Sequence, residues 1–136
     1  MTKNNSLKLL SKKTYIESID KQYQGIEDLR NDLFQIKKGN CELIEVSQLF
    51  YKLIYIKTHY FMQEQITLAK YKYDRLSVIK AIHNVFIDKV MADREGIKPD
   101  SKIFCVEMLD FINNWFVDYI EINNDAVKFL ISKNVK

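Results

Sequence analysis

The sequence predicts an all-α protein, folded as an up-down-up-down antiparallel four-helix bundle. Two features of its composition favour this fold: 47% of the 136 residues are hydrophobic, and breakers are scarce, with three Gly and one Pro. Strands joined by tight turns would need more of those breakers. The third observation is that apolar residues recur every three or four positions in four long segments, which is the spacing of helices with one buried face.

The first two predicted helices cover residues 17–38 and about 42–71. The inward stripe of the first consists of Ile16, Ile19, Tyr23, Ile26, Leu29, Leu33 and Ile36, and it stops at Gly39. The inward face of the second consists of Val46, Leu49, Leu53, Ile56, Tyr60 and Glu64. A carboxylate therefore ends a stripe that is otherwise apolar or aromatic.

The other two predicted helices cover about 76–93 and 100–124. Their inward rows are Leu76, Ile79, His83, Phe86, Ile87 and Val90, then Phe104, Met108, Phe111, Ile112, Trp115 and Tyr119. Asn123 and Asn124 are expected to end the fourth helix, with a short C-terminal helix over 126–132. Short connections make the neighbours antiparallel. We expect one bundle domain over residues 15–136, preceded by a basic N-terminal arm over 1–14.

The net charge of +3 comes from the arm, because four of the 21 basic residues precede the first acid, Glu17. The rest of the chain is close to neutral, so no nucleic-acid partner is expected. No apolar run approaches the ~18 residues of a membrane span, so no membrane partner is expected either. Cys41 and Cys105 lie far apart in sequence and are expected to be reduced, buried thiols. We therefore predict a cytoplasmic protein.

Polar or aromatic side chains interrupt the apolar stripes on every predicted helix. They are Tyr23 on the first, Tyr60 and Glu64 on the second, His83 on the third, and Tyr119 and Asn124 on the fourth. Helical bundles build metal sites from inward side chains of this kind, one turn apart on facing helices. In an antiparallel bundle these six positions can share one level, which makes them the candidate site.

The spacing of this set resembles the hemerythrin family. That family has a histidine on the first helix, His-x-x-x-Glu on the second, His-x-x-x-His on the third, and a histidine followed five residues later by an aspartate on the fourth. The segments IDKQYQGIEDL, YFMQEQ and WFVDYIEINND match this pattern. The family's ligand positions then fall on Tyr23, Tyr60, Glu64, Ile79, His83, Tyr119 and Asn124. The resemblance covers residues 15–130 and implies the bundle fold, while only Glu64 and His83 keep the family's ligand types.

Histidine content argues against a di-iron centre of the family's type, which needs five imidazoles. The chain has two histidines, His59 and His83, and His59 is expected on the flank of its helix or exposed. We interpret the site as a metal-free, hydrogen-bonded centre in which phenols satisfy Glu64. A bundle with such a centre is expected to act by binding or regulation through its surface, with a protein partner or small molecule. It would have no cofactor, no enzymatic activity and no reversible oxygen carriage.

Two alternatives stay open at this point. Phenolate, imidazole and carboxylate are suitable ligands for ferric iron, so Tyr23, Tyr60 and Glu64, with His83 or Tyr119, could hold one ion for iron handling or for oxygen or redox sensing. Alternatively, the bundle could pair with another protein, or with a second copy, through an exposed helix face. The sequence does not fix the oligomeric state.

Overall fold

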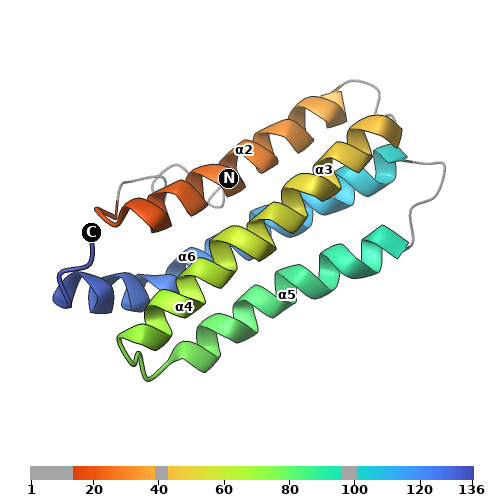
Figure 1. Ribbon diagram of the computed structural model, residues 1–136. Helices are drawn as coiled ribbons and strands as arrows, with labels where there is room; N and C mark the ends of the chain where they lie inside the picture. Colours follow the sequence, from red (N-terminus) through yellow and green to blue (C-terminus); the bar gives the residue numbers. More distant parts are fainter. Residues whose placement is uncertain (1–13, 39–42, 96–100) are drawn as a thin grey trace.

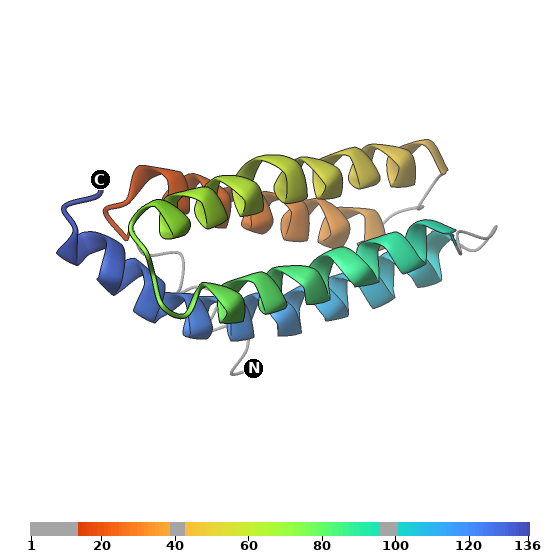
Figure 2. The ribbon, with the colours of Figure 1, turned by 60° about the horizontal axis from the view of Figure 1, so that its bottom comes forward.

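The computed structural model describes residues 14–38, 43–95 and 101–136, and it confirms the all-helical bundle (Figure 1). The elements are α2 (Glu17–Lys38), α3 (Leu43–Tyr55), the π-helix η1 (Ile56–Phe61), α4 (Met62–Lys70), α5 (Leu76–Glu95) and α6 (Ser101–Ser132). Because α3, η1 and α4 continue one another, four long segments result (Figures 1 and 2). The predicted arm over 1–14 lies outside the described residues, apart from Thr14.

The four segments form a closed ring around one core. Each segment packs against the next one along the chain, and α2 packs extensively against α6, which closes the ring. The C-terminal end consequently lies near the start of α2 (Figures 1 and 2). The buried stripes predicted from periodicity meet in this core, where Ile26, Leu53, Phe86 and Ile112 are almost completely inaccessible to solvent.

The last segment differs from the prediction, because α6 runs without a break from Ser101 to Ser132. The expected end at Asn123 and Asn124, and the separate short C-terminal helix, are therefore wrong. Asparagine ends helices when its side chain competes for nearby backbone groups. The buried Asn123 amide instead donates a hydrogen bond to the Tyr23 hydroxyl on α2, at 2.8 Å. The helix can then continue its buried face through Ala126 and Leu130.

The second segment contains a wider turn that periodicity did not predict. Over η1 the chain is a π-helix, and its two buried residues, Ile56 and Phe61, are five positions apart. In a regular helix the residue four positions after Ile56 would face the core, and that residue is Tyr60. The extra residue in the turn places Phe61 inside and moves Tyr60 to a half-buried position on the flank. Glu64 and Leu68 then continue the inward face of α4.

Cys105 is buried and disulfide-bonded, so the expected reduced thiol is wrong at this position. The other cysteine of the chain, Cys41, lies outside the described residues.

The sequence predicts no membrane-spanning segment. None of the helices in the described part of the chain has both the length and the apolar character needed to cross a bilayer.

Candidate functional site

The carboxylate of Glu64 is buried at the middle of the bundle, and one of its oxygens accepts hydrogen bonds from two donors. The Tyr119 hydroxyl on α6 donates to Oε1 of Glu64 on α4. The His83 Nε2 on α5 lies 2.9 Å from the same oxygen and 3.3 Å from the Tyr119 hydroxyl. All three side chains are at least 97% inaccessible to solvent. Three helices therefore converge on one carboxylate oxygen.

The imidazole of His83 is held in one orientation by its neighbours. Its Nδ1 lies 2.8 Å from the Gln65 side-chain nitrogen, a donor, so Nδ1 accepts and Nε2 carries the proton that points at Glu64. The Phe61 ring stacks on the imidazole at 3.9 Å between centroids, with 7° between the planes. Phe61 reaches this place because of the π-turn in η1. The wider turn thus supplies one wall of the site.

Two amide side chains that the sequence did not single out complete the centre. The Gln22 Nε2 donates to the Tyr119 hydroxyl at 2.7 Å, and the Asn123 Nδ2 donates to the Tyr23 hydroxyl at 2.8 Å. These two bonds cross between α2 and α6, since Gln22 precedes Tyr23 and Asn123 lies one turn after Tyr119. The signal that could have identified Gln22 and Asn123 is their position directly beside, or one turn from, an inward tyrosine.

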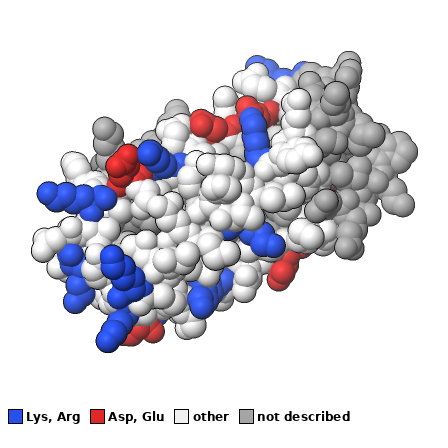
Figure 3. Space-filling view, viewed as in Figure 1, with Lys and Arg blue, Asp and Glu red and all other residues white. Residues whose placement is uncertain are grey.

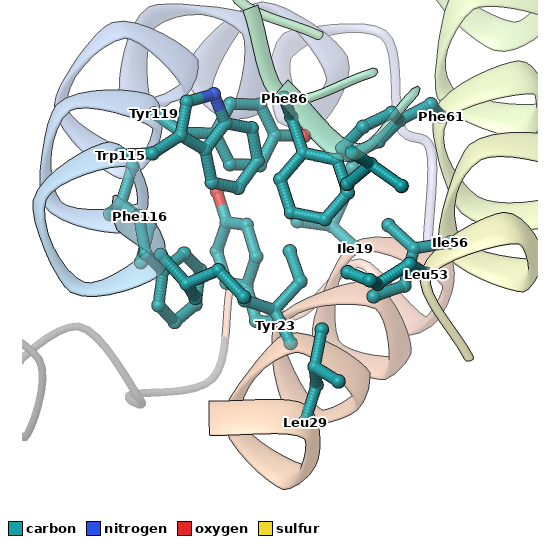
Figure 4. Close-up of a cluster of buried hydrophobic side chains, with 14 of the residues drawn as sticks. Ile19, Tyr23, Leu29, Leu53, Ile56, Phe61, Phe86, Trp115, Phe116 and Tyr119 are labelled. Carbon is teal, nitrogen blue, oxygen red and sulfur yellow. The ribbon is translucent and has the colours of Figure 1, made fainter. Parts of the chain in front are cut away.

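The two phenols lie in a buried aromatic cluster (Figure 4). Tyr119 stacks on Trp115 at 4.8 Å, and the Tyr23 ring meets the Tyr119 ring edge-on at 6.1 Å. Burial raises the pKa of Tyr119 well above its ordinary value, and the nearby Glu64 charge raises it further. Burial also raises the pKa of Tyr23, against the opposing effect of the Asn123 hydrogen bond. Both groups therefore stay neutral phenols at physiological pH.

The centre has more acceptors than donors. Three buried oxygens of this centre have no hydrogen-bond partner among the described residues: Gln22 Oε1, Glu64 Oε2 and Asn123 Oδ1. Gln22 and Glu64 both use their other polar atom on the Tyr119 hydroxyl, so their spare oxygens lie near that group. Unpaired buried acceptors are uncommon in native proteins, and they are the atoms that a water molecule or a cation would satisfy.

The structure brings together four of the predicted site residues, Tyr23, Glu64, His83 and Tyr119. Ile79, which the resemblance predicts at a family ligand position, is 1% exposed and belongs to the hydrophobic core.

Two predicted site residues lie elsewhere. Tyr60 is on the flank, where its ring meets Tyr55 edge-on at 5.4 Å and lies against Gly25 of α2. Asn124 is exposed, and the preceding residue, Asn123, takes the inward position. Asn124 was predicted from the family's aspartate, five residues after the position of Tyr119, but one full helical turn after Tyr119 is residue 123.

The donor set does not fit a pair of irons held mainly by imidazoles. His59 is exposed and stacks on Tyr55 at 4.0 Å, as expected for a residue outside the core. His83 is then the single imidazole in the centre, beside one carboxylate, two phenols and the amides of Gln22, Gln65 and Asn123. Within the described ranges no three His, Cys, Asp or Glu side chains gather closely enough to hold a metal ion.

Comparison with known proteins agrees with the resemblance seen in the sequence. The chain is similar to a bacteriohemerythrin of Clostridium acetobutylicum, with 25% identity over 109 residues. The alignment covers 77% of this chain and 84% of that protein. No protein-family model matches the chain, and no solved structure matches it.

Proposed function

We propose, from the premise that this chain is a hemerythrin-like protein, that it is a binding or regulatory module with a degenerate di-iron site and not a reversible oxygen carrier. The observation that carries the proposal is the shared oxygen of Glu64. Oε1 of this carboxylate already accepts hydrogen bonds from Tyr119 and His83. A carboxylate that bridges a pair of irons uses both of its oxygens, so Glu64 could bridge two irons only by giving up the two protein donors on Oε1.

The imidazole supports the same conclusion. Both ring nitrogens of His83 are engaged by protein groups, Nε2 with Glu64 and Nδ1 with Gln65. Neither nitrogen offers a free lone pair, which is what a metal ligand must provide. The chemistry available to these residues is to hold each other in place, and we propose neither a cofactor nor an enzymatic activity. The cytoplasmic location stays a prediction.

Iron analysis tests this proposal. The full chain would be expressed with ample iron, purified without chelators and analysed for metal by mass spectrometry. The expected result is iron far below one atom per chain. Two irons per chain, with Glu64→Gln abolishing them and the exposed Gln63→Glu leaving them in place, would overturn the proposal.

A second candidate function rests on the three unpaired oxygens of Gln22, Glu64 and Asn123. Together with the phenols of Tyr23 and Tyr119 they form an oxygen-rich set suited to one hard cation such as Fe(III). The protein would then serve in iron handling or in oxygen or redox sensing. Such an ion would have to displace phenol protons whose pKa is raised by burial.

Absorption spectra separate the two candidates. A tyrosinate-to-iron band in iron-loaded protein, lost in Tyr119→Phe and kept in Tyr60→Phe, would favour the iron site, because Tyr60 lies outside the centre. The absence of the band at stoichiometric added iron would favour the metal-free module.

A further inference from the structure

The outward side of α3, η1 and α4 carries large apolar side chains that the bundle leaves exposed. Tyr51, Tyr55, Met62 and Ile66 are 77%, 48%, 52% and 62% exposed. Tyr51 and Tyr55 lie one turn apart on α3, and Met62 and Ile66 lie one turn apart on α4, and both pairs are on the outward side of the segment. We call these four residues the α3–α4 face. Figure 3, which views the molecule with α3 and α4 in front, shows an uncharged stretch over this region.

The exposed charge on residues 48–72, the segment that carries the α3–α4 face, is of one sign. Between residues 48 and 72 the exposed charged side chains are Lys52, Lys57, Lys70 and Lys72. The one acidic residue of that stretch is Glu64, which is buried in the bundle centre. Lys52 forms an ion pair with Asp32 of α2 at the edge of the face. A partner that covers this face therefore meets apolar side chains and an excess of positive charge, with four lysines on the segment against Asp28 and Asp32 of α2.

A hollow lies beside the face, between α2 and the π-turn. Its volume is about 200 Å³, and its lining residues are Gly25, Asp28, Leu29, Lys52, Tyr55, Ile56 and Tyr60. The missing side chain of Gly25 makes room for the Tyr60 ring, since a Cβ atom at residue 25 would lie 2.8 Å from that ring. A volume of about 200 Å³ is enough to take one large side chain of a partner. The single acid of the hollow, Asp28, accepts a hydrogen bond from Gln24.

We propose that the α3–α4 face binds an acidic amphipathic helix of another protein, which inserts one apolar side chain into the hollow. This inference rests on the proposed function as a binding module and names the class of partner. Apolar residues of such a helix would cover the face, while its Asp and Glu side chains would meet the lysines. Residues 51–66 span about 22 Å of helix, so a partner helix of about 16 residues covers the face.

Charge and shape favour this occupant over two others. A second copy bound through the same face would bring lysines against lysines, which opposes a two-fold dimer. An anionic membrane would match the charge but has no side chain to fill the hollow.

The test uses a synthetic peptide as the probe. A fluorescein-labelled helix of about 16 residues, with Leu at positions i, i+4, i+7 and i+11 and Glu at most others, is titrated with the full chain by fluorescence anisotropy. The control peptide has the same composition in scrambled order. The expected result is saturable binding of the patterned peptide, about tenfold or more tighter than that of the scrambled one, which weakens with added salt.

Paired variants locate the binding surface. Ile66→Ser and Lys57→Glu, both at exposed positions of the segment, are expected to weaken binding about tenfold each. The controls on α6, Ile131→Ser and Lys128→Glu, make the same changes at exposed positions elsewhere, and they are expected to leave the affinity within about twofold. All four substitutions are at exposed sites, so thermal unfolding should be nearly unchanged.

Three results would overturn the proposal. Equal binding of the patterned and scrambled peptides would mean that only charge is recognised. Equal effects of the paired variants and their controls would place the binding elsewhere. Binding to phosphatidylserine vesicles but not to the peptide, lost in the same variants, would identify a membrane surface. Iron content measured on the same preparation tests the proposed function separately, so failure of one is distinguishable from failure of the other.

Discussion

The hydroxyl of Tyr119 and the carboxylate of Glu64, 55 residues apart in the chain, meet at a single oxygen in the middle of the bundle. The contact joins α6 to α4, and His83 on α5 adds a second bond to the same oxygen. A buried carboxylate costs several kcal/mol if it lacks partners. These two donors therefore explain how the bundle keeps Glu64 in its core.

Removing the hydroxyl of Tyr119 should destabilise the fold. Tyr119→Phe deprives Glu64 of one donor and leaves the Gln22 amide without its acceptor. The expected loss is about 1–3 kcal/mol in the free energy of unfolding, measured by urea denaturation. Tyr51→Phe, at a position 77% exposed, is the control and should change stability by less than about 0.5 kcal/mol. Equal effects of both changes would contradict the role assigned to the hydroxyl.

Stability should fall at alkaline pH because of the buried phenols. Burial raises the pKa of Tyr23 and Tyr119 in the folded state above that of the unfolded chain, which is about 10. Their contribution is full below about pH 10 and is lost as the pH rises from there, since the unfolded chain releases protons that the native state retains.

Each of the two phenols should contribute a slope of about 1.4 kcal/mol per pH unit above that pH. Urea denaturation between about pH 8 and 11 measures it. Tyr23→Phe should make the decline shallower, whereas Phe116→Leu, which removes core volume but no titrating group, should keep the slope. An unchanged slope in Tyr23→Phe would show that this phenol ionises equally in both states.

Gly25 and Tyr60 should be energetically coupled. Alanine in place of glycine stabilises an ordinary helix position by about 0.5–1 kcal/mol. At residue 25, however, the added Cβ would lie 2.8 Å from the Tyr60 ring. Gly25→Ala should therefore give no gain alone, and should stabilise the fold in a Tyr60→Ala background. A double-mutant cycle by urea denaturation should show a coupling of about 1 kcal/mol or more, and additive effects would contradict the close contact.

The π-turn predicts an unusual tolerance to deletion. Removing the exposed Thr58 from η1 would leave Ile56 and Phe61 four positions apart, so a regular helix could keep both inside. The matched deletion of the exposed Gln63 would instead rotate Glu64 and Leu68 away from the core. Circular dichroism melts should show a folded bundle for the first deletion and a loss above about 3 kcal/mol for the second. The reverse order would contradict the register described for this segment.

Periodicity was sufficient to predict the four helical segments, because each buries one continuous stripe. It could not reveal the π-turn, since Ile56, Tyr60 and Glu64 also have regular helical spacing, and the choice between Tyr60 and Phe61 depends on packing against His83 and Gly25. The five-residue spacing of the family pattern likewise selected Asn124, whereas helix geometry places Asn123 inside.

The part of the candidate site that could be predicted consists of residues in the inward stripes of the helices. A polar or aromatic residue that interrupts an apolar stripe can be recognised in the sequence alone, and this identified Tyr23, Glu64, His83 and Tyr119. Gln22 was missed because a glutamine that lies beside the apolar stripe of a helix, and not within it, is normally exposed to solvent. Its burial depends on the Tyr119 hydroxyl, which belongs to a helix 97 residues away.

The crossed bonds from Gln22 to Tyr119 and from Asn123 to Tyr23 also have a consequence for biosynthesis. They join partners 97 and 100 residues apart, so the ribosome has made α2 through α5 long before either bond can form. Until α6 is synthesised, the Glu64 carboxylate and the Gln22 amide lack the Tyr119 hydroxyl, which is their hydrogen-bond partner in the folded protein. Completion of α6 then closes the bundle in one late step, and a chain cut short before it would remain open to proteases.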